Sequence, residues 1–112
     1  MIVSAWHDGH GTYGLRIIGA GRGLWFRPEW RWVTVYLPDE PKPACMPISE
    51  GFWQASPELR SPRVRAFLER NGLVPWERNR PPHFELEPVG GGVFRLRWIE
   101  RLEAQPTLSF ER

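Results

Sequence analysis

Hydrophobic and polar residues alternate with a period of two in several parts of the chain, most clearly over residues 83–99. The apolar positions there are Phe84, Leu86, Phe94, Leu96 and Trp98, and the charged positions between them are Glu85, Glu87, Arg95 and Arg97. Three consecutive glycines at 90–92 separate the two halves and allow the positive φ angles of a tight turn. The pattern predicts a C-terminal β-hairpin with one face on a core and Glu–Arg pairs across the other.

Shorter strands are predicted near 2–6, 12–18, 30–37 and 45–48, between turns rich in glycine and proline. The segment 30–37, WRWVTVYL, has the strongest β pattern, and both of its faces are largely apolar. We therefore expect it to lie centrally in a sheet. The apolar segment 24–26 is expected to form a bridge or an edge piece, and Phe52 and Trp53 are expected to fill the core.

One helix is signalled, near residues 62–71. Ser61 is a capping residue, Pro62 occupies the first helical position, and apolar residues follow at helical spacing. Asn71 and a following glycine provide a left-handed stop. The expected fold class is therefore mainly β (α+β): a small twisted sheet or barrel-like fold of six or seven short strands, with this helix covering one opening.

Composition agrees with a single domain over residues 1–112, because 12 Pro and 11 Gly imply many turns between short elements. The seven Trp suggest a core built from indole and phenyl rings. Cys45 is the one cysteine, so no internal disulfide is expected, and its apolar neighbours suggest burial. We expect no signal peptide and no membrane span, which makes the cytoplasm the expected compartment.

The net charge is only +2, yet 14 of the 15 basic residues are arginine, and several are interleaved with aromatic residues. Such a pattern is typical of surfaces that stack nucleobases and contact phosphates. The first hypothesis is therefore a module that binds DNA or RNA. Its predicted contact residues are Arg22, Trp25, Arg27, Arg31, Trp76, Arg78 and Arg80.

Two other functions remain open. The first is a protein-interaction or homodimerisation module, since Trp and Arg dominate interface energetics and the loop 38–44 is rich in proline. The second is a small-ligand or metal site at His7, Asp8 and His10, whose side chains include metal-binding types.

Neither the glycine-rich segment 17–23 nor the surroundings of the serines and the cysteine support catalysis. The segment 17–23, IIGAGRG, resembles a dinucleotide fingerprint, but its third glycine comes one residue early and a poor helix start follows. No serine or cysteine lies in a nucleophile motif. We therefore expect neither an enzyme nor a cofactor.

Overall fold

The structure is a computed structural model and describes residues 1–99. Its strands are β1 (Ile2–His7), β2 (Tyr13–Ile17), β3 (Trp32–Tyr36), β4 (Ala44–Pro47), β5 (Glu58–Arg60), β6 (His83–Gly90) and β7 (Val93–Trp98). Its helices are α1 (Gly21–Trp25), α2 (Glu50–Gln54) and α3 (Pro62–Arg70). In these residues no helix is both long and apolar enough to span a membrane.

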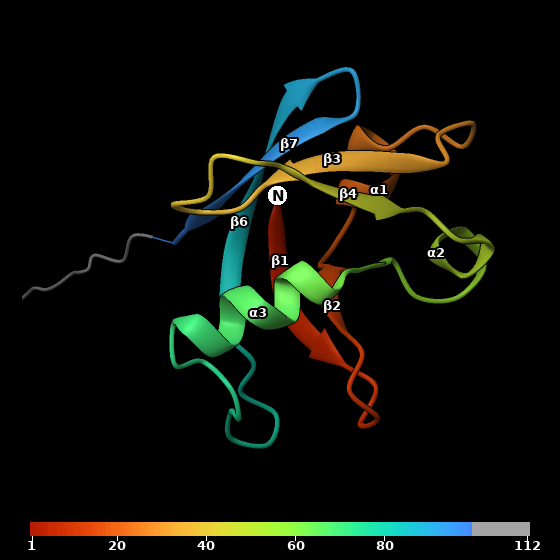
Figure 1. The fold of residues 1–112 in the computed structure, drawn as a ribbon. Coiled ribbons are helices and arrows are strands. Elements are labelled where there is room, and N and C mark those ends of the chain that lie inside the picture. The colour runs from red at the N-terminus through yellow and green to blue at the C-terminus, as the bar shows by residue number, and fades with distance from the viewer. Residues whose placement is uncertain (100–112) are drawn as a thin grey trace, which may run out of the picture.

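All seven strands belong to one sheet, in the order β4-β3-β7-β6-β1-β2-β5 (Figure 1). Neighbouring strands are antiparallel except β3 and β7, which run parallel. The sheet curls until its edge strands β4 and β5 approach each other, so the barrel is nearly closed. The predicted mainly β, barrel-like class is confirmed.

The predicted C-terminal hairpin is confirmed as β6 and β7. Leu86 lies opposite Leu96, and a register shift follows at Pro88. Gly91 and Gly92 make the turn with φ angles of 61° and 82°. The Glu–Arg pairing takes a different form from a simple ladder, because the Glu87 carboxylate lies 3.4 Å from both Arg95 and Arg97.

The predicted helix is confirmed as α3. The Ser61 hydroxyl accepts a hydrogen bond from the Arg63 backbone amide at 3.1 Å, and Pro62 begins the helix. The buried side of the helix consists of Val64, Phe67 and Leu68. Phe67 packs against Phe84 and Trp98, with ring centroids 5.7 and 5.4 Å away. The helix therefore covers the core beside the start of β6 and the end of β7.

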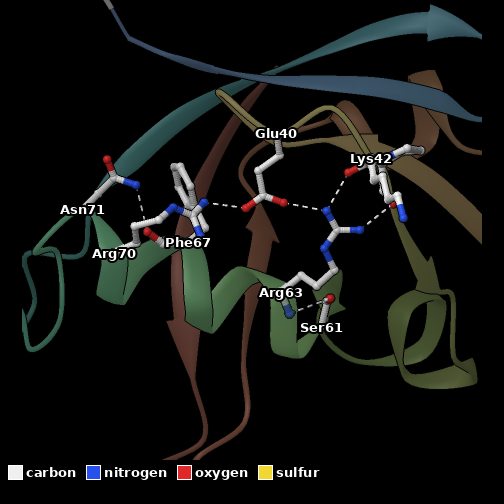
Figure 2. A network of polar contacts seen from close by, with 8 residues as sticks. Glu40, Lys42, Ser61, Arg63, Phe67, Arg70 and Asn71 are labelled. Atoms are coloured by element: carbon white, nitrogen blue, oxygen red, sulfur yellow. Dashed lines mark hydrogen bonds and ion pairs between the residues drawn. The ribbon is translucent and has the colours of Figure 1, made fainter.

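Glu40, in the loop between β3 and β4, fastens that loop to α3 (Figure 2). Its carboxylate lies 2.5 Å from the guanidinium of Arg63 and also pairs with that of Arg70. Arg63 additionally donates to the backbone oxygens of Lys42 and Pro43. The hydrogen bond from Arg63, assisted by Arg70, lowers the pKa of Glu40 against the opposing effect of partial burial.

Two short helices correct the expectation of a single one. The segment 24–26, expected as a bridge or edge piece, contributes instead to α1 and its C-cap. Phe52 and Trp53 lie in α2, where Phe52 is fully buried and Trp53 only partly. Each helix has only five residues, which is too short to leave a helical period in the sequence, and neither N-cap residue makes a side-chain hydrogen bond.

The core corrects the expected cluster of indole rings. Its aromatic residues are phenylalanines: Phe26, Phe52, Phe67, Phe84 and Phe94 are all buried. All seven tryptophans lie in the described chain, and none of them is among the buried residues. Cys45 is likewise exposed, because the alternation along β4 turns Ala44 and Met46 inward instead. Trp30, Trp53 and Trp76 pack against this core while partly buried, whereas Trp25, Trp32, Trp98 and Cys45 are exposed.

Candidate functional site

The residues predicted to bind nucleic acid lie in two separate regions. Trp25, Arg27 and Arg31 belong to the segment that passes the turn between β6 and β7. Trp76, Arg78 and Arg80 belong to the connection between α3 and β6, which lies at the opposite end of the molecule in Figure 1. The two groups therefore do not form a single patch.

Arg22 has a structural role. Its guanidinium donates to the backbone oxygens of Phe52 at 2.8 Å and Trp53 at 3.4 Å. Both hydrogen bonds come from Nη1, one of the donor groups of the guanidinium, and they connect α1 to α2.

At the opposite end, Trp76 packs against other aromatic residues. Its ring centroid lies 5.0 Å from that of His7 and 6.1 Å from that of Tyr13. Arg80 forms an exposed ion pair with Glu77 at 3.5 Å, and Arg78 is exposed. The aromatic contacts explain the position of Trp76 without a ligand.

The candidate metal residues shape the turn between β1 and β2. Asp8 Oδ1 accepts hydrogen bonds from the backbone amides of His10 at 2.7 Å and Thr12 at 3.1 Å. The amide of His10 is the main cause that lowers the pKa of Asp8. His7 Nδ1 accepts from the amide of Gly9 at 3.0 Å. Within residues 1–99, no three His, Cys, Asp or Glu residues are grouped so as to hold a metal ion.

The glycine-rich segment 17–23 leads from β2 into α1, and the next strand is β3. In a dinucleotide-binding unit these two strands would lie parallel in one sheet region. Here β2 and β3 are not neighbours, because three strands, β7, β6 and β1, lie between them in the sheet. The segment is therefore not part of such a unit.

A hollow lies between two parts of the chain: the turn that joins β6 to β7, and the segment made of α1 and the residues after it. We call this hollow the tip groove. It has a volume of about 690 Å³. Its walls include Trp25, which is 48% exposed, and Trp30, whose ring lies 3.8 Å from an ideal Cβ on Gly92. Arg27 is the one charged residue among the described residues that line it. The groove thus combines aromatic walls with a single positive charge.

A second surface, which we call the β3 face, consists of the outward residues of β3 with those of β7 beside them. Trp32 and Tyr36 are 60% and 39% exposed, and Thr34 lies between them on the same side of the strand. Tyr36 is in register with Arg95 on the parallel strand β7, and Arg97 follows on the same side. The face therefore carries two exposed aromatic rings, one of which, Tyr36, lies beside the guanidinium-bearing Arg95.

Only one side of β3 is buried, although the sequence makes both of its faces largely apolar. Val33 and Val35 face the core, whereas the side that carries Trp32 and Tyr36 faces water. The signal was present in the sequence, because aromatic residues recur at alternate positions around a threonine. Sequence reasoning missed it, since aromatic residues on a strand are equally typical of a core.

The tip groove and the β3 face are connected. A smaller hollow between them is lined by residues 29–32 together with Gly91 and Gly92. It shares Trp30 with the groove and Trp32 with the face, and Arg31 lies at the junction. Trp25, Arg27 and Arg31, three of the predicted contact residues, therefore lie on or beside one continuous surface.

The charges along this surface nearly cancel. The basic side chains are Arg27, Arg31, Arg95 and Arg97, and the acidic side chains are Glu29, Glu85 and Glu87. Glu87 is shared between the two arginines of β7. A ligand held here must therefore gain more from ring contacts than from charge.

Comparison with known proteins adds no relative: no family model, curated protein or solved structure matches this chain.

Proposed function

We propose that the protein binds single-stranded nucleic acid on the β3 face, with bases stacking on Trp32 and Tyr36 and phosphates contacting Arg31 and Arg95. The observation that carries the proposal is the pair of exposed rings on one side of β3, with Arg95 in register with Tyr36. Single-stranded nucleic acids are held in this way, by aromatic platforms with adjacent cations. This activity fits the cytoplasmic location expected from the sequence.

Because the charges on this surface nearly cancel, most of the binding free energy must come from stacking of bases on the aromatic rings. Stacking contributes about 1–3 kcal/mol per base, so two rings supply most of the affinity. If Arg31 and Arg95 each neutralise one phosphate, the slope of log K against log salt is about −1.4, which is shallow. Duplex DNA keeps its bases stacked internally, so the proposal predicts a preference for single strands.

The test is a fluorescence anisotropy titration of a labelled dT or rU decamer with the protein and with variants Trp32→Ala and Tyr36→Ala. Each variant should weaken binding about fivefold or more, because each removes one stacking platform. Tyr36→Phe keeps a ring and should bind within about twofold of the parent protein. Thermal melting of each variant confirms that it remains folded.

Absence of binding to single strands at low salt would remove the proposal. So would unchanged affinity in both alanine variants, because the bases would then contact some other surface.

A second candidate function is self-association through the tip groove. Two aliphatic residues on its walls favour it, since Leu24 is 72% exposed and Val89 is 54% exposed. Aliphatic exposure of this kind is typical of protein contacts. Sedimentation over a concentration series should then show a dimer that Leu24→Ser dissociates, whereas a monomer at every concentration excludes this function.

A further inference from the structure

We infer that the tip groove receives the terminal nucleotide of the bound strand, with its base on Trp25 and its terminal phosphate beside Arg27. This inference rests on the proposed function, because the strand must first lie on the β3 face. It assigns to the groove a ligand class that is aromatic and anionic. A free nucleotide is separated from it by the test below, and a second copy of this chain by the sedimentation series described above.

The charge on the walls of the tip groove favours an anionic ligand. Arg27 is the one charged residue on its described walls, and no carboxylate is present there. Four other hollows on the described surface each include at least one carboxylate. A phosphate placed in the tip groove would therefore meet a guanidinium without a competing negative charge.

Shape and lining select a planar ligand. The volume of about 690 Å³ lies within the range of small-molecule sites. Trp25 is 48% exposed and lines the groove, and the glycines at 90–92 add no side chains to its walls. A base is planar and aromatic, so it can use the ring face, whereas an aliphatic side chain gains less from that geometry.

The position of the tip groove favours the end of a nucleic acid strand over its interior. The groove continues from the β3 face through the hollow that contains Arg31, so one strand can reach both. On the side away from the β3 face, α1 forms the wall of the tip groove, and Leu24 and Trp25 line it. A terminal monophosphate carries a charge of about −1.5 to −2, more than an internal phosphate, and is therefore the stronger partner for a single Arg.

The test compares dT octamers that differ only at one end. Three octamers are used, with a 5′-phosphate, a 3′-phosphate or hydroxyl groups at both ends, and binding is measured by calorimetry without a label. One of the two phosphorylated octamers should bind about tenfold more tightly than the hydroxyl form. Arg27→Gln should abolish this preference and leave the affinity for the hydroxyl form within about twofold.

Arg95→Gln is the matched control, since Arg95 lies on the β3 face rather than in the groove. It should weaken all three octamers by a similar factor and keep the preference for the phosphorylated end. Arg27 is exposed, so its replacement should leave the melting temperature unchanged. Trp25→Ala should weaken the phosphorylated octamer more than Trp25→Phe does.

Equal affinity for all three octamers would overturn the inference, and so would an end preference that survives Arg27→Gln. Free dTMP that displaces the octamer as effectively as the phosphorylated octamer itself would also overturn it, by showing a site for free nucleotides. If no octamer binds at all, the proposed function fails as well. If octamers bind through Trp32 and Tyr36 without an end preference, only the terminal-nucleotide site fails.

Discussion

Gly14 occupies a position in β2 where a larger residue has no room. It lies between Trp6 of β1 and Arg60 of β5, and an added Cβ would come within 2.4 Å of the Leu59 backbone oxygen. Because backbone atoms cannot rotate away, Gly14→Ala should reduce the free energy of unfolding by about 1–3 kcal/mol. Urea denaturation followed by tryptophan fluorescence measures this loss.

Gly23→Ala is the control for this substitution. Gly23 lies in α1, and no atom comes within 4 Å of its added Cβ. Its stability should stay within about 0.5 kcal/mol of the parent or rise slightly, since alanine favours a helix. If both variants lose the same stability, the close contact at Gly14 is not the cause.

Individual arginines differ more in their roles than their spacing in the sequence indicates. Arg60 lies with its guanidinium 4.7 Å from the Trp6 ring centroid, and it pairs with the buried carboxylate of Glu58 at 3.0 Å. Arg22 donates hydrogen bonds from Nη1 to backbone oxygens of α2. The interleaving of arginine with aromatic residues therefore marks structural contacts as well as candidate binding residues.

At the scale of elements, α3 depends on its N-cap. The Ser61 hydroxyl accepts the Arg63 amide, and Ser61 is itself buried. Ser61→Ala should therefore lower the stability by about 1 kcal/mol. Thermal denaturation with Ser49→Ala as the control checks this, because Ser49 precedes α2 without a side-chain cap bond. An equal loss in the two variants would show that the cap bond at Ser61 contributes nothing specific.

The attachment of the β3–β4 loop to α3 predicts a dependence on pH. Because its arginine partners hold the pKa of Glu40 below its ordinary 4.5, the carboxylate stabilises the fold above that pH. This contribution is lost as the pH falls through the lowered pKa of the folded state. Arg63 and Arg70 are 37% and 51% exposed, so solvent screening limits the contribution to about 1 kcal/mol.

Glu40→Gln should therefore lower the free energy of unfolding at pH 7, and the difference from the parent should vanish in acid. Denaturation at several pH values between 2 and 7 checks this. Glu77→Gln is the control, since Glu77 and Arg80 are 77% and 80% exposed and their pair should contribute little. A difference for Glu40→Gln that persists unchanged in acid would contradict the assigned role of the carboxylate.

At the scale of the whole molecule, the two ends of the barrel-like sheet should act independently. The double variant Arg78→Ala with Arg80→Ala changes the end that lies opposite the β6–β7 turn, and should alter decamer affinity less than twofold (Figure 1). Arg31→Ala should weaken it about threefold or more, because Arg31 lies between the groove and the β3 face. Anisotropy titrations in one buffer compare them. Equal losses would show that a strand contacts both ends.

The sequence by itself determined the parts of this protein that depend on neighbouring residues. The hairpin of β6 and β7 follows from alternation around a glycine turn, and α3 follows from Ser61, Pro62 and an apolar stripe. These signals suffice because the residues that interact lie a few positions apart, or face each other across a short turn. Trp25, Arg27 and Arg31 were predicted in the same way, as a local cluster in the sequence.

Only the tertiary structure decided which surfaces are free. The parallel pairing of β3 with β7 joins segments about 60 residues apart, and it sets Tyr36 beside Arg95. Whether a ring on a strand is buried depends on what distant segments place over it, which no local pattern records. For the same reason, only the folded chain shows that Trp32 is exposed, that Arg22 contacts the backbone of α2, and that Trp76, Arg78 and Arg80 lie apart from the remaining predicted contacts.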